Sequence, residues 1–210
     1  MAKLPLPPAR TLPWDLKPLS SARTGLSYDR YGRMVMTIEH DLLKGVTPRM
    51  VEWWFRNIGG QMKIDGKRLD KYLVWHPFDH IRCELASPAP VGGAAKGARF
   101  RIVEMFNANP DFYIDVVEKV IRLDETGITL VNRTPGFEIT RLNHDFIVDP
   151  GGTLYRSTLT IGASVPVIRN ILNPLLHRLV FSEAMGHAWL RHNVEEVGAL
   201  EHILPRIYPS

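Results

Sequence analysis

The chain has 210 residues, of which 45% are hydrophobic, so it can bury a sizeable core and lies within the size range of one domain. Its 26 Lys and Arg residues only slightly outnumber its 22 Asp and Glu residues, and the basic clusters are short, which argues against a nucleic-acid partner. No stretch has the length and apolarity of a membrane span and no signal-peptide pattern is present, so we expect no membrane partner. The single cysteine, Cys83, excludes an internal disulfide and a cysteine-rich metal site and favours a reducing, cytoplasmic location.

Prolines dominate the start of the chain. Five of them fall within residues 1–20, which predicts an extended arm because proline cannot continue a helix. Residues 21–210 are expected to form a single catalytic domain. Within it, apolar residues first alternate in 33–40, a pattern typical of a strand.

A helix is predicted next. Pro48 follows Thr47 in a typical helix start, and two consecutive glycines, Gly59 and Gly60, are a typical helix stop. The spacing between them places an apolar stripe on one helix face. Its members are Met50, Trp53, Trp54 and Ile58.

Six later segments have the alternation expected of strands. They are residues 71–76, 98–106, 112–121, 127–131, 136–148 and 153–162. The last two are predicted to form a hairpin through the turn residues 149–152. After Pro166 the spacing becomes helical and predicts one long helix from Leu175 to about Leu204, with a break near Pro174. This order favours an α+β fold in which a curved antiparallel sheet wraps the final helix, as in the Bet v 1-like helix-grip architecture.

The final helix carries a pair of residues that can share a metal ion. His192 and Glu196 are four positions apart and therefore lie on one helix face, one turn from each other. The simpler alternative is a surface contact between the two side chains. Two imidazoles and two carboxylates would suit zinc if this pair met two further ligands.

Glu104 is the best candidate for a carboxylate from the sheet. Alternation places it on the same strand face as Phe100, Ile102 and Phe106, and a buried carboxylate needs a partner. That partner is a metal ion or a basic side chain, unless this face points outward at a sheet edge. His80 and His76 compete as the second imidazole, and their spacing does not choose between them.

Two polar residues of the predicted hairpin are candidates for a cavity lining. His144 shares a strand face with Leu142 and Phe146, and Tyr155 shares one with Leu159. The simpler alternatives are a hydrogen-bonded, half-buried histidine and an aromatic core residue.

Three segments together resemble one enzyme family. Residues 50–60 (MVEWWFRNIGG), 71–80 (KYLVWHPFDH) and 191–205 (RHNVEEVGALEHILP) are similar to the 2,4-diacetylphloroglucinol hydrolases, a family that includes phloretin hydrolase. The similarity spans roughly residues 22–205. It implies a Bet v 1-like fold whose cavity holds a catalytic zinc ion.

The resemblance also assigns roles to residues. It implies that zinc is bound by His80, Glu104, His192 and Glu196. It implies that Tyr72, eight residues before the first ligand, binds the phenolic substrate, and that His144 and Tyr155 contribute to catalysis, Tyr155 also contacting the substrate. Cys83 stands where the family has a polar amide that contacts the substrate, so this chain departs from the pattern at a substrate-binding position.

The function that the resemblance implies is hydrolysis of the carbon–carbon bond between an acyl group and a polyphenolic ring, by a retro-Claisen mechanism. The expected partner is a small acylated polyphenol, and a homodimer is one expected assembly. Two alternatives stay open at this point. One is a noncatalytic helix-grip protein that binds a hydrophobic ligand, and the other is a polyketide-tailoring cyclase or decarboxylase that uses the same metal cavity.

Overall fold

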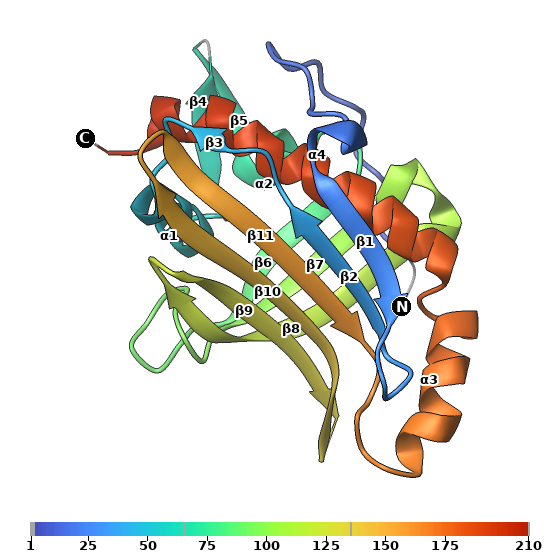
Figure 1. Ribbon diagram of the computed structural model, residues 1–210. Coiled ribbons are helices and arrows are strands. Elements are labelled where there is room, and N and C mark those ends of the chain that lie inside the picture. The colour runs from blue at the N-terminus through green and yellow to red at the C-terminus, as the bar shows by residue number, and fades with distance from the viewer. Residues whose placement is uncertain (1–2, 65, 135, 210) are drawn as a thin grey trace.

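A strongly curved antiparallel sheet forms the centre of the structure, a computed structural model that describes residues 3–64, 66–134 and 136–209 (Figure 1). The described residues place nine strands in this sheet. They are β1 (Arg23–Tyr28), β2 (Met34–Glu39), β3 (Leu43–Lys44), β6 (His80–Ser87), β7 (Arg99–Met105), β8 (Tyr113–Asp124), β9 (Gly127–Thr134), β10 (Phe137–Asp149) and β11 (Gly152–Ile161). The order across the sheet is β1-β2-β11-β10-β9-β8-β7-β6, with the short β3 also pairing with β11.

The register of the sheet already brings two candidate ligands together. His80 opens β6 at one edge of the sheet and pairs directly with Glu104 of the neighbouring β7. The predicted hairpin of residues 136–162 is confirmed, since β10 and β11 pair from Thr140↔Ile161 to Asp149↔Gly152. A second, two-stranded sheet consists of β4 (Gln61–Ile64) and β5 (Lys67–Asp70), which the sequence pattern did not predict.

The part of the chain that the structure describes contains four α-helices beside the sheet. They are α1 (Pro48–Arg56), α2 (Lys71–Trp75), α3 (Ile168–Leu179) and α4 (Glu183–Ile207), with short 3-10 turns at Leu19–Ser21, Phe106–Ala108 and Pro110–Phe112. Helix α4 crosses the hollow of the sheet (Figure 1), so the expected helix-grip arrangement is confirmed. Thr47 caps α1 as predicted, because its side chain accepts a hydrogen bond from the Met50 amide. The buried face of α1 differs from the predicted stripe, since Val51 and Phe55 are buried and Trp53 is only half-buried.

The prediction of a strand at residues 71–76 is wrong. These residues form α2, because the Asp70 side chain accepts a hydrogen bond from the Leu73 amide and starts a helical turn. Five helical residues are too few to show a helical period in sequence. Tyr72 and His76 therefore lie one turn apart and are joined by a hydrogen bond from the His76 amide to the Tyr72 carbonyl.

The prediction of one long C-terminal helix broken near Pro174 is also wrong. Pro174 lies inside α3, and the break falls at residues 180–182. There the amides of Val180 and Phe181 both donate to the Leu176 carbonyl, which closes α3. The Ser182 hydroxyl then accepts from the Met185 amide at 3.2 Å and starts α4.

Two apolar clusters fill the space between sheet and helix. The C-terminal half of α4 packs with α1, α2 and strands β8 to β10, and its N-terminal half packs with β2 and β11. Residues 3–18 contain no helix or strand, and Trp14 from this segment stacks on His202 of α4 at 5.4 Å between ring centroids. Among the described residues, no helix combines the length and apolarity needed to cross a membrane.

We predict that Leu200→Ala strongly destabilises the protein. Leu200 is fully buried on α4, and truncating it leaves a cavity that neighbouring side chains only partly fill. The free energy of unfolding, measured by urea denaturation, should fall by about 2 to 5 kcal/mol. Val148→Ala is the matched control, because Val148 is 78% exposed, and it should change that free energy by less than about 0.5 kcal/mol.

Candidate metal centre and adjoining cavity

Four buried side chains converge between the sheet edge and α4. The Nε2 atom of His80 lies 3.6 Å from Glu104 Oε1 and 3.4 Å from Glu196 Oε2. The Nε2 atom of His192 lies 3.7 Å from Glu104 Oε2 and 3.9 Å from Glu196 Oε2. The four residues that sequence analysis selected from distant parts of the chain are thus brought together. We call them the quartet.

The outer nitrogen of each quartet histidine is already engaged. His80 Nδ1 donates to the Tyr72 carbonyl at 2.7 Å, because a carbonyl can only accept. His192 Nδ1 lies 3.0 Å from Asp79 Oδ2 and donates to it. Both Nε2 atoms therefore face the carboxylates, and His80 Nε2 is buried without a hydrogen-bond partner among the described residues. Histidine ligands of metals are oriented by hydrogen bonds of this kind.

Asp79 is held by the backbone on its other side. Its two carboxylate oxygens accept hydrogen bonds from the amides of Asn107 and Ala108 at 3.0 and 3.1 Å. Both of these residues have a positive φ, of 56° and 51°, which turns their amides toward Asp79. These bonds and His192 outweigh burial and lower the pKa of Asp79 to about 2, so it stays ionised.

The two histidines that the sequence left open have different neighbours in the structure. His76 forms a second close group with Asp79 and His192, but its nitrogens are engaged elsewhere. Its Nδ1 accepts from the Asp79 amide at 3.1 Å, and its Nε2 lies 3.0 Å from Glu195 Oε2. His80, and not His76, faces Glu104 and Glu196.

Burial and the neighbouring charges shift the pKa values of the quartet residues. Burial raises the pKa of Glu104 to about 7, and the nearby Glu196 carboxylate adds to this rise. Burial alone would lower the pKa of His192, but Asp79 and the two glutamates raise it to about 9. Burial lowers the pKa of His80 to about 4. His80, Glu104 and His192 form a close buried group that could hold a metal ion. Glu196 lies beside this group, and a cation there would compensate both carboxylates.

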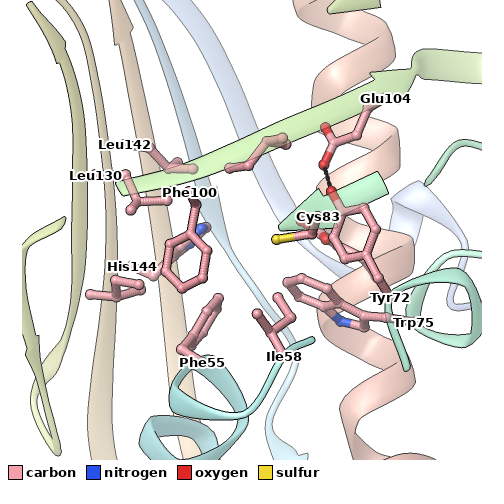
Figure 2. A pocket seen from close by; sticks show the side chains of 13 residues that line it. Phe55, Ile58, Tyr72, Trp75, Cys83, Phe100, Glu104, Leu130, Leu142 and His144 are labelled. Carbon is pink, nitrogen blue, oxygen red and sulfur yellow. Dashed lines mark hydrogen bonds between the residues drawn. The ribbon is translucent and has the colours of Figure 1, made fainter. Parts of the chain in front are cut away.

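A cavity of about 50 Å³ adjoins the quartet and is lined mainly by apolar and aromatic side chains. Figure 2 shows Tyr72 and Glu104 on one side of it and His144 on the opposite side, with Cys83 beside Tyr72. The Tyr72 hydroxyl donates a hydrogen bond to Glu104. Burial raises the pKa values of Tyr72 and Cys83 above their ordinary values, so both groups carry their protons at neutral pH.

His144 and Tyr155 lie deeper in the sheet. His144 lines the cavity, and its Nδ1 atom is 2.9 Å from the Ser157 hydroxyl, which also contacts His40 Nε2 at 2.9 Å. Tyr155 does not line this cavity. Its ring lies 5.2 Å from that of His144, and its buried hydroxyl has no hydrogen-bond partner in the described part of the chain.

The comparisons with known proteins identify the family. Residues 20–209 match the family described as the DAPG hydrolase PhiG domain, where DAPG is 2,4-diacetylphloroglucinol. The chain belongs to this family. No curated protein sequence matches it significantly.

The similar solved structures give information on the fold of this DAPG hydrolase domain. A START superfamily protein from Mycobacterium smegmatis has a TM-score of 0.50 and 12% identity, with 81% of this chain and 97% of that chain covered. A protein from Thermus thermophilus has a TM-score of 0.48 and 13% identity, with 84% and 98% covered. The fold is the START and Bet v 1-like α+β fold, and the family is one of hydrolases.

Sequence reasoning missed the residues that support the quartet in this DAPG hydrolase domain. Asp79 immediately precedes His80, but nothing in the local pattern says that its side chain turns toward α4. Asn193 donates to Glu196 Oε1 at 2.6 Å from three positions earlier on the helix, a spacing that the sequence does show.

We predict that His144→Phe weakens the dependence of stability on pH. Burial lowers the pKa of His144 from 6.5 to about 4, so between these values the unfolded chain binds more protons than the folded one. Stability therefore falls as the pH falls through this window. Without His144, the difference in unfolding free energy between about pH 7 and about pH 4.5 should shrink by on the order of 1 to 3 kcal/mol.

Urea denaturation at both pH values, with a chelator present throughout, measures this difference. His187→Phe is the control, because His187 is exposed on α4 and its loss should leave the pH dependence unchanged. An unaltered pH dependence in His144→Phe would contradict the assignment of a neutral, buried imidazole.

Proposed function

We propose that this chain is a zinc-dependent hydrolase that cleaves the carbon–carbon bond between an acyl group and a polyphenolic, phloroglucinol-type ring. The observation that supports this most directly is the convergence of His80, Glu104, His192 and Glu196 beside an aromatic-lined cavity. Membership of the DAPG hydrolase family supports the reaction class. The substrate would be a small acylated polyphenol.

The quartet fits zinc in chemistry and in size. Two imidazole nitrogens and two carboxylates are borderline-to-hard donors of the kind that zinc accepts. Tetrahedral bonds of 2.0 to 2.1 Å place neighbouring donor atoms about 3.3 Å apart. The separations between the histidine nitrogens and the carboxylate oxygens here are 3.4 to 3.9 Å, which is slightly longer than that spacing.

The proposed reaction consumes one water molecule. The water oxygen bonds to the acyl carbon, the bond from that carbon to the ring breaks, and the ring carbon takes up a proton. The products are a carboxylic acid and the free polyphenol. When bound, zinc supplies Lewis acidity in a cavity that excludes bulk water. Hydroxyl groups on the ring let it accept the departing electron pair as a ketonic tautomer.

The remaining residues would bind the substrate and move protons. The Tyr72 hydroxyl, whose one proton is donated to Glu104, would accept a hydrogen bond from a phenolic hydroxyl group of the substrate. Cys83 beside it offers only a weak S–H donor. His144, which is neutral at pH 7 and lines the cavity, would take up and return a proton. The Tyr155 ring lies 5.2 Å from that of His144, and its hydroxyl, which has no hydrogen-bond partner among the described residues, would assist His144.

We predict about one zinc ion per chain in protein purified without added metal. Glu104→Ala and His192→Ala should each lose the metal, as measured by elemental analysis, and should lose hydrolysis of an acylphloroglucinol. His187→Ala is the matched control on the same helix, because its exposed side chain points away from the quartet. A metal-free variant with full turnover would refute the proposal.

Product analysis in the same experiment separates the alternatives. Equal amounts of acid and free phenol support hydrolysis of the carbon–carbon bond. Unchanged ligand would point to a binding protein, and a ring-closed product or carbon dioxide would point to a cyclase or decarboxylase.

A further inference from the structure

A second cavity adjoins the first and also borders the quartet. Its volume is about 110 Å³, and it shares four lining residues with the first cavity: Ile102, Glu104, Leu142 and Glu196. The two glutamates of the quartet therefore face both cavities. The second cavity also touches His192 and is otherwise lined mainly by apolar side chains, among them Ile114, Phe181 and Trp189.

A carboxyl group stands in this apolar lining. Glu118 of β8 is only 6% exposed and lines the second cavity with Thr140, whose hydroxyl donates to Glu118 Oε1 at 2.8 Å. Among the described residues, no basic side chain lies within 4.0 Å of this carboxyl group, and Thr140 is its one hydrogen-bond partner. Burial raises the pKa of Glu118. The second carboxyl oxygen has no hydrogen-bond partner among the described residues and is left for a ligand or for water.

The strand register gives the backbone spacing between Glu118 and the position of Glu104. Glu104 pairs with Ile114, and Phe100 pairs with Glu118, so Glu118 is four residues from the Glu104 position along the strands. At 3.3 Å per residue this is about 13 Å. Part of this spacing is taken up by a hydrogen bond to Glu118 and part by the metal beside Glu104. About six covalent bonds of a ligand span the remainder.

We propose that the second cavity binds the acyl arm of the substrate, and that Glu118 and Thr140 hold a terminal hydroxyl group of that arm. This inference rests on the proposed function. The acyl carbon carries both the ring and the arm, so when it lies beside Glu104 and Glu196, which line both cavities, each substituent can enter a different cavity. The first cavity holds Tyr72 and the aromatic side chains suited to a phenolic ring, which leaves the second for the arm.

A hydroxyl group fits this position better than the other possible ends of an arm. It can donate to the free Glu118 oxygen or accept from the carboxyl when that is protonated, so it pairs in either state. A methyl end would leave the carboxyl unpaired in an apolar cavity. An ammonium end would bring a second charge out of water, at a large desolvation cost.

The test compares two phloroglucinol ketones that differ only at the end of the arm. One carries a 6-hydroxyhexanoyl group, about six bonds from acyl carbon to hydroxyl oxygen, and the other carries heptanoyl, which has a methyl group there. The wild-type protein should show a kcat/KM about tenfold higher for the hydroxyl arm. Glu118→Leu should lower that value about tenfold while keeping or raising the value for the methyl arm, and Thr140→Val should act in the same direction.

Glu125→Leu is the matched control, because Glu125 is exposed in a turn and should leave both values unchanged. Thermal melting checks that each variant folds. If Glu118→Leu does not fold, Thr140→Val provides the test. Equal effects of both variants on the two ketones, or no wild-type preference, would overturn the inference.

Binding of the same ketones, followed by tryptophan fluorescence, separates this inference from the proposed function. Trp75 lines the first cavity and Trp189 the second, so both report occupancy. A preference in Kd for the hydroxyl arm that Glu118→Leu abolishes supports the arm site even if no ketone is hydrolysed. Hydrolysis of both ketones without such a preference leaves the proposed function standing and rejects the arm site.

Discussion

The burial of two carboxylates against two imidazoles within one small volume is the constraint on which the rest of this structure depends. Charges removed from water are tolerated only when they are paired, and here four ionisable groups meet with the lone pair of His80 left without a donor. The surroundings are consistent with this constraint. Asp79 and the Tyr72 carbonyl fix both rings, and Asn193 occupies the outer oxygen of Glu196. These contacts leave the Nε2 atoms of both histidines directed toward the carboxylates, while Glu104 also accepts a hydrogen bond from the Tyr72 hydroxyl.

The sequence predicted the position of a side chain where it lies in a regular helix or strand. It did not predict the position where the side chain lies in a short turn. Helical spacing put His192 and Glu196 on one face, and strand alternation put Glu104 inside the sheet, as the structure has them. His76 and His80 could not be separated because the segment before them is a single helical turn, started by the side chain of Asp70. The helix break at Ser182 was misplaced because Pro174 is the more conspicuous residue in sequence, although α3 accommodates it. Asp79 was missed because its role depends on backbone amides from a different part of the chain.

Fold and chemistry come from different observations in this protein. The START superfamily structure shares the curved sheet and long helix at 12% identity, which supports the architecture and says nothing of the reaction. The family and the quartet narrow the chemistry to a hydrolase with a site that can hold a metal ion. Two cavities meet at Glu104 and Glu196, so a ligand in either one would lie beside these carboxylates.

Helix α4 contributes half of the quartet and also many of the most deeply buried apolar side chains, including Leu200, Ile203 and Leu204. Lifting it from the sheet would expose the core along its whole length, so that motion costs nearly as much free energy as global unfolding. The helix therefore cannot serve as a lid. Any opening that admits a ligand has to come from smaller, locally less stable segments around the rim, while His192 and Glu196 stay in place on α4.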